Sequence, residues 1–246
     1  MTTRAVDPSS PEAVPGWDDA HRYSPAPRHR RRLLLDLMAQ LDGVSELLDA
    51  GCAQPFLLEE TVERFGWTPY GCDISEGVIE ANRERHPDWE FLVLDLAREG
   101  WPGDRRFDLV VSSEVLEHVP DWRAALTSLC AMSEKHLLIT VPCGQIRPMD
   151  RLVGHLQHFT PELLGNAVRE EGLEVVEVRR WGFPMHTLYR SLVNRMGAEA
   201  MYDAFSGGSS YGAGKRLTAK AIGVSFHVND LFRSGEQLLL RARRAA

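Results

Sequence analysis

Apolar segments of two kinds alternate along most of this chain, and this alternation constrains the fold more than any other feature. Short apolar runs typical of buried strands are separated by stretches with helical spacing of Leu, Val and Ile. Strands are expected at residues 45–50, 70–74, 90–94, 107–112, 136–141, 174–179 and 237–243. Helices are expected at residues 30–41, 57–65, 76–85, 123–132 and 160–171. The pattern predicts an α/β fold, a mainly parallel sheet with helices on both faces.

Two regions interrupt the alternation and divide the chain. Residues 1–29 are rich in proline and polar residues, which predicts a flexible N-terminal arm. Residues 181–234 are longer than a simple crossover connection, and we expect them to form a helical lid over a binding site. The core is then residues 30–180, completed by a final strand and tail over residues 235–246.

Composition and charge exclude several classes of partner. The formal net charge of −7 argues against nucleic acid as a partner, because phosphate binding favours a basic surface. The basic clusters Arg28–Arg32 and Arg241–Arg244 are interpreted as a solvated helix start and tail, with a binding patch as the alternative. No apolar run approaches the roughly 20 residues of a membrane span, so no membrane association is expected. Four cysteines without zinc-ligand spacing and no signal peptide predict a cytoplasmic protein.

Acidic residues end the first three expected strands. Asp49 precedes the turn Gly51-Cys52-Ala53, where a glycine lets the backbone turn tightly beside a ligand. Asp73-Ile74 ends the second strand, where a carboxylate can bind both ribose hydroxyls of an adenosine; a helix cap is the alternative. Asp95-Leu96 ends the third, where Asp95 could accept from an adenine amine while Leu96 flanks the base, or Asp95 could be a turn residue.

The segment after the fourth strand carries the candidate catalytic group. Its sequence runs from Ser113-Glu114 to Glu117-His118, at the edge of the sheet where a ligand is expected. His118 titrates near neutrality and could act as general base, although a lone histidine is often structural. Side chains of the kinds that bind divalent metals also occur here: Glu114, Glu117 and His118, with His155 or His158. A metal site is the less favoured interpretation, and we expect none.

Taken together, in this order and spacing, these segments resemble class I S-adenosylmethionine (SAM)-dependent methyltransferases of the small-molecule branch. Residues 49–55 look like the family's first motif, and Asp73 looks like its ribose-binding acid. The resemblance covers about residues 45–180 and implies a Rossmann-like sheet of seven strands, the last antiparallel. It implies that SAM is bound by a set of ten residues: Asp49, Gly51, Cys52, Ala53, Asp73, Ile74, Asp95, Leu96, Ser113 and Glu114.

The resemblance implies transfer of a methyl group from SAM to a small molecule by in-line displacement, most simply to a hydroxyl with His118 as base. Methylation of N or C, the identity of the acceptor and the oligomeric state stay open. Ala53 and Pro55 replace the second and third glycines of the family motif, so a non-catalytic binding protein is the alternative. A nicotinamide oxidoreductase would need a glycine-rich phosphate cradle, which this turn lacks.

Overall fold

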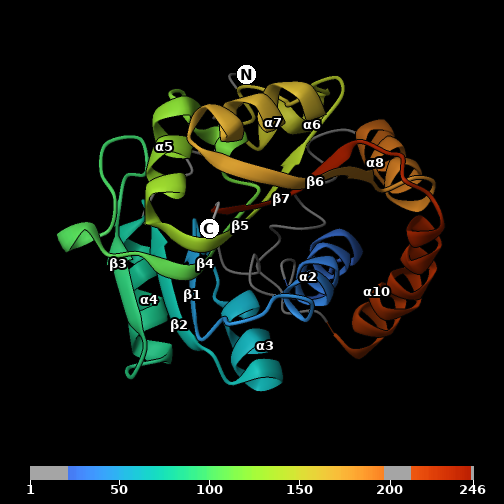
Figure 1. Cartoon of the computed structure of the whole chain (residues 1–246). Coiled ribbons are helices and arrows are strands. Elements are labelled where there is room, and N and C mark those ends of the chain that lie inside the picture. The colour runs from blue at the N-terminus through green and yellow to red at the C-terminus, as the bar shows by residue number, and fades with distance from the viewer. Residues whose placement is uncertain (1–21, 197–211, 245–246) are drawn as a thin grey trace, which may run out of the picture.

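A seven-stranded sheet runs through the chain, which the computed structural model describes over residues 22–196 and 212–244 (Figure 1). The strands are β1 (Glu46–Ala50), β2 (Thr68–Asp73), β3 (Glu90–Val93), β4 (Phe107–Ser113), β5 (Ser133–Pro142), β6 (Leu173–Trp181) and β7 (Gln237–Arg244). Their order is β3-β2-β1-β4-β5-β7-β6. β7 is antiparallel to β5 and β6, and the other pairs are parallel. The expected mostly parallel sheet with an antiparallel last strand is confirmed.

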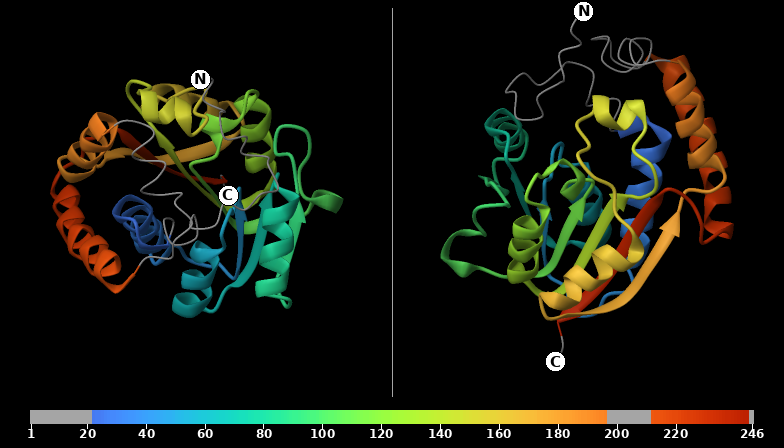
Figure 2. Two further views of the ribbon diagram at one scale, coloured as in Figure 1. Left: turned by 180° about the vertical axis from the view of Figure 1, so that it is seen from behind. Right: turned by 90° about the horizontal axis from the view of Figure 1, so that it is seen from above.

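Helices cover both faces of the sheet, because alternate residues of its buried strands point to opposite sides. On one face, α5 (Trp122–Met132) and α7 (Pro161–Glu170) pack over a core that includes Leu48. On the other, α2 (Pro25–Met38), α3 (Phe56–Phe65) and α4 (Glu76–Arg85) pack over a core that includes the neighbouring Leu47. Figure 2 shows the two helical layers from behind and from above.

Further helices lie beside this core. They are α6 (Pro148–Leu152), α8 (Met185–Met196) and α10 (Ala213–Ser225), with the 3₁₀ turns η1 (Pro102–Asp104), η2 (Leu116–His118) and η3 (Phe226–Leu231). α10 packs against α2, and the two helices lie side by side in Figures 1 and 2. Within the described ranges, no helix has the length and apolar character needed to cross a membrane.

The first helix differs from the sequence expectation. α2 begins at Pro25, five residues before the expected start at Arg30, so residues 25–29 are helical rather than part of a flexible arm. Pro25 and Pro27 lie in the first turn, where the backbone N–H groups that proline lacks would have no helical partner. Two of the prolines that suggested an arm, Pro25 and Pro27, therefore belong to a helix start. Residues 1–21 of the expected arm lie outside the described residues.

Candidate active site

The turn after β1 lies where the strand order changes direction. β1 pairs with β2 on one side and β4 on the other, and such switch points at the carboxyl ends of parallel strands are where α/β sheets bind ligands. The N–H groups of Gly51 and Cys52 both donate to the carbonyl of Cys72, at 2.8 and 2.9 Å. Gly51 has φ +83°, and a Cβ there would lie 2.3 Å from a methyl carbon of Val115. Position 51 therefore admits no side chain.

Ala53 keeps the backbone conformation that a glycine would adopt. Its φ is +41°, in the left-handed region. Its N–H donates to Oδ2 of Asp73 at 3.0 Å, and its carbonyl accepts from Nδ2 of Asn82 at 2.8 Å. Pro55 immediately precedes α3, where its lost N–H breaks no helical bond. The substitutions at 53 and 55 therefore leave a formed turn that is bonded to Asp73.

Two carboxylates end neighbouring strands at this turn. Asp73 also accepts from the N–H of Ser75, at 3.0 Å. Burial raises the pKa of Asp73, and the hydrogen bonds from Ser75 and Ala53 oppose that shift. Burial also raises the pKa of Asp49 to about 7, and the charge of Asp73 adds to this effect. The site therefore holds two closely spaced acidic groups, which favour a ligand that brings hydrogen-bond donors.

The predicted adenine-side residues Asp95 and Leu96, and the predicted cofactor-binding residue Ile74, are placed differently from one another. Asp95 accepts from the N–H of Ala97 at 3.0 Å and pairs with the exposed Arg98, while the side chain of Ile74 is about half exposed. Leu96 is buried in the core on the side of α5. Asp95 and Ile74 thus remain accessible, whereas the side chain of Leu96 is buried in the core next to this turn.

The residues after β4 form a second turn at the same edge. The hydroxyl of Ser113 lies 3.0 Å from that of Thr140, and the N–H of Glu114 donates to the Thr140 carbonyl. Glu114 has φ +60°, a strained conformation for a residue with a side chain, and such strain often occurs at functional sites. Its carboxylate pairs with Arg30 of α2 at 3.3 Å.

Val115 joins this turn to the first one. Its side chain packs against Gly51, and its carbonyl accepts from the N–H of His118 at 2.9 Å. Val115 therefore contacts both the turn after β1 and the residue predicted as the base. Burial lowers the pKa of His118, and among the described residues its buried Nδ1 has no hydrogen-bond partner.

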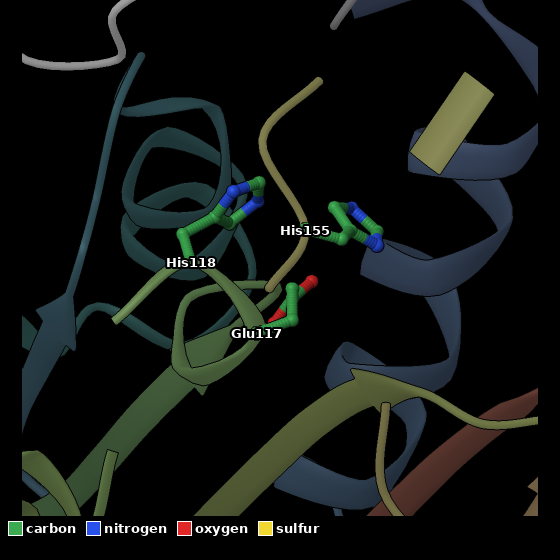
Figure 3. Close-up of side chains that lie close together, drawn as sticks. All are labelled: Glu117, His118 and His155. Carbon is green, nitrogen blue, oxygen red and sulfur yellow. The ribbon is translucent and has the colours of Figure 1, made fainter. Parts of the chain in front are cut away.

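Figure 3 shows Glu117, His118 and His155 close together. Each of the three side chains offers one potential metal-ligand atom, and these atoms lie within 4.8 Å of one another. Glu117 is fully buried, and neither of its carboxylate oxygens has a partner in the described part of the chain. Burial raises the pKa of Glu117 well above its usual range, with Glu114 adding to the effect. Glu114 itself pairs with Arg30 and is not in this group.

This group fits a divalent ion, since a carboxylate oxygen and two imidazole nitrogens are common ligands and an ion would satisfy the orphaned carboxylate. An ion bound there would lower the pKa of a hydroxyl that coordinates it. His118 and Glu117 belong to the ligand set considered from the sequence, and of the two histidine alternatives it is His155 that joins them.

A hydrogen-bonded histidine pair fixes which nitrogen of His155 is free. Nδ1 of His158 lies 3.2 Å from the Gly144 carbonyl, which can only accept, so this nitrogen carries the hydrogen. Burial lowers the pKa of His158, so its Nε2 is the acceptor for Nδ1–H of His155, at 3.0 Å. Nε2 of His155 is therefore left with its lone pair.

Sequence reasoning did not identify Asn82 or Arg30 as site residues. Asn82 is a buried polar residue on α4, and Arg30 belongs to the basic cluster that was interpreted as solvated. A polar residue at a core-facing helical position is a signal for Asn82, whereas the Arg30–Glu114 contact joins positions far apart in sequence and has no local signal.

Comparison with known proteins identifies the family of the chain. A family model described as "Methyltransferase domain" matches residues 20–178, so the chain belongs to that methyltransferase family. It is a SAM-dependent methyltransferase with a Rossmann-like fold, and it is an enzyme rather than a non-catalytic relative.

Two curated relatives act on small molecules according to their names. The chain is 27% identical over 201 residues to a ubiquinone biosynthesis O-methyltransferase of Thiobacillus denitrificans, covering 71% of this chain and 84% of the relative. It is 32% identical over 105 residues to a trans-aconitate 2-methyltransferase of Rhizobium rhizogenes, covering 42% of this chain and 40% of that relative. The chain thus spans most of the first relative and less than half of the second.

Solved structures share the fold at low identity. A phosphoethanolamine N-methyltransferase 2 of Haemonchus contortus in complex with SAM matches with a TM-score of 0.61 and 15% identity, over 94% of this chain and 57% of that one. The N-methyltransferase NodS of Bradyrhizobium japonicum with S-adenosylhomocysteine (SAH) matches with a TM-score of 0.58 and 20% identity, over 93% of each chain.

Proposed function

We propose that this enzyme methylates a hydroxyl group of a small molecule. The observation that carries the proposal is the joining of two turns at one sheet edge: Asp73 is bonded to Ala53, and Val115 packs on Gly51. The turn expected to bind the cofactor and the turn that leads to His118 are therefore in direct contact. The two curated relatives described above, one named as an O-methyltransferase, support a small-molecule acceptor. N- or C-methylation is the alternative.

We assign SAM to the first turn. Asp73 would accept the ribose hydroxyls, with Asp95 and Ile74 beside the adenine. The wall along the methionine portion of SAM would be formed by Asp49, Gly51, Cys52 and Ala53. The opposite wall would be formed by Ser113 and Glu114. The ribose assignment is supported by the place of Asp73 at the end of β2, bonded to the glycine turn.

The acceptor would lie on the His118 side. In-line transfer from a sulfonium requires chiefly that the two reactants be held in line, so positioning should supply most of the rate. His118 would receive the proton of the acceptor hydroxyl. Residues 197–211 of the expected lid lie outside the described residues. We also propose that the described parts of the segment 181–234 cover the acceptor. This is supported by Arg190 of α8, which donates to Asp150 and, at 3.2 Å, to Glu236, and so ties α8 to the sheet edge.

The proposal also covers the location of the protein and its macromolecular partners. A cytoplasmic location is supported by the four cysteines, all free and buried. Absence of a nucleic-acid partner is supported by the net charge of −7.

The test is a methyl-transfer assay with radiolabelled SAM and a panel of phenols, hydroxy acids, carboxylic acids and amines. We expect label to enter a hydroxyl-bearing acceptor, and His118→Ala to lower kcat by roughly 10²–10⁴-fold while the affinity for SAM is retained. His86→Ala, which removes a histidine that stacks on Trp89, is the matched control and should leave kcat unchanged. Label entering amines alone, or equal kcat in the two variants, would contradict the proposal.

A further inference from the structure

Most of the basic cluster Arg28–Arg32 lines an open cavity at the protein surface, in which Arg28 is exposed and Arg31 and Arg32 are half-buried. A cavity of about 430 Å³ lies between α2 and α10, within the size range of small-molecule sites. Its wall comes mainly from these two helices and the turn that follows α10. The lining residues are Pro25, Arg28, His29, Arg31, Arg32, Glu60, Lys220, Gly223, Val224 and His227.

The charges in this wall are unbalanced. Four permanent cations face a single carboxylate, that of Glu60, in a chain whose net charge is −7. Glu60 pairs with Arg31 at 3.0 Å, and Arg32 pairs with Asp230, which lies just outside the cavity wall, at 2.6 Å. In the parts of the chain that the structure describes, the charged ends of Arg28 and Lys220 have no hydrogen-bond or ion-pair partner. Arg32 also pairs with Asp36 at 3.1 Å, so the uncompensated positive charges of the cavity are those of Arg28 and Lys220.

The helix that supplies most of these cations increases the imbalance. The N-terminal end of a helix carries partial positive charge, which favours acidic side chains in the first turn. α2 has none there, and Arg28, Arg30, Arg31 and Arg32 follow within its first two turns. Burial lowers the pKa of Arg31, Glu60 opposes that shift, and the charges of Arg30 and Arg28 add smaller lowering effects. An anion bound in the cavity would relieve the repulsion among these arginines.

The cavity also has space and an apolar side. Gly223 lies inside α10, where glycine weakens a helix relative to alanine. A Cβ at this position would face the guanidinium of Arg28 at 3.8 Å, so a larger side chain would enter the cavity. Pro25 and Val224 provide apolar surface for a carbon skeleton.

We propose that this cavity binds a small organic anion with two or more carboxylate or phosphate groups, held chiefly by Arg28 and Lys220. Arg30, on the same helix, contacts Glu114 at the sheet edge, so the cavity and the active site are joined through α2. The proposal does not depend on the identity of the methyl acceptor.

Calorimetric titration with citrate and with inorganic pyrophosphate at low ionic strength tests the proposal. We expect binding of at least one probe by the wild type, weakened at least tenfold in the Arg28→Ala/Lys220→Ala double variant. The matched control is Arg106→Ala/Arg123→Ala, which removes two exposed arginines elsewhere and changes the net charge equally. Affinity in the control should match the wild type.

Gly223→Leu provides a second variant that leaves the charge unchanged. Leucine favours helix, so α10 should persist, and its side chain would occupy the cavity. We expect loss of anion binding with thermal unfolding at or above the wild-type temperature. Absence of heat from the wild type at millimolar concentrations of both probes, or equal weakening in the two double variants, would overturn the proposal.

Discussion

At the scale of single residues, the active site combines strain with buried charge. Ala53 and Glu114 both have positive φ, in the turns that follow β1 and β4 and that touch through Gly51 and Val115. Asp49 and Glu117 are buried carboxyl groups, and burial raises the pKa of each. Conformational strain and buried acids both destabilise a folded chain, so their presence at one sheet edge indicates a site shaped for a ligand.

The strain at Ala53 can be measured by removing its Cβ. A left-handed conformation costs an L-residue about 1–2 kcal/mol, whereas glycine adds about 0.4–1 kcal/mol of unfolded-state entropy. We expect Ala53→Gly to raise the free energy of unfolding by about 0.5–1 kcal/mol in urea denaturation. Ala81→Gly, at an exposed position inside α4, is the control and should lower it by about the same amount. Equal losses in both variants would show that position 53 is unstrained.

The buried carboxyl of Asp49 predicts a particular pH dependence of stability. Its pKa is about 7 in the folded chain, against 3.8 as its ordinary value, so the folded state binds its proton more tightly than the unfolded state. This contribution to stability is fully present below pH 3.8 and is lost as the pH rises through 7. Asp49→Asn has no titrating group at this position, so this pH-dependent loss of stability should be absent.

Urea unfolding of wild type and Asp49→Asn at pH 5 and pH 8 measures this effect. We expect the free energy of the variant, relative to wild type, to rise by a few kcal/mol between the two pH values, on a scale of about 1.4 kcal/mol per pKa unit. Comparing the two pH values cancels the pH-independent cost of the buried amide. Identical pH dependence in the two proteins would mean that Asp49 has an ordinary pKa.

At the scale of elements, α2 connects the sheet, α10 and the turn that carries Glu114. It packs against the sheet through its leucines, contacts α10 on its other side, and reaches Glu114 with Arg30. The side chains of Arg30 and Glu114 are 16% and 17% exposed, so their ion pair is weakly screened and should exceed a typical surface pair.

A double-mutant cycle with Arg30→Ala and Glu114→Ala isolates this contact. We expect a coupling free energy of about 0.5–1.5 kcal/mol in chemical denaturation, and a smaller value in high salt. Arg123 and Glu170, an exposed pair at 2.9 Å between α5 and α7, form the comparison cycle with a coupling below about 0.5 kcal/mol. If the two cycles give equal coupling, α2 is not held at the edge by this pair.

At the scale of the whole molecule, sequence patterns predicted the sheet and its edge but not the long-range contacts. Apolar runs and their flanking turns are local signals, so all seven strands fall close to their expected positions. The acidic residues that end these strands were likewise visible. The bonds of Arg30 to Glu114 and of Ala53 to Asp73 join distant positions, and they depend on packing that no local pattern contains.

Two interpretations from sequence required the three-dimensional arrangement to be resolved. The departure at Ala53 suggested a degenerate cofactor loop, yet its backbone adopts the glycine-like conformation and bonds to Asp73. The arginines of α2 suggested a solvated helix start, and Arg28 is indeed exposed, but Arg28, Arg31 and Arg32 also line an open cavity because α10, nearly 200 positions later, packs beside them. Charge clusters are therefore hard to interpret before their neighbours are known.

We propose that the turn after β1 and the carboxylate that ends β2 bind SAM together. A crystal structure of the enzyme with SAH would show whether they do. We expect both ribose hydroxyls within hydrogen-bonding distance of the Asp73 carboxylate, and the sulfur facing the turn that carries His118. A cofactor bound away from Asp73, or a sulfur directed away from that turn, would contradict it.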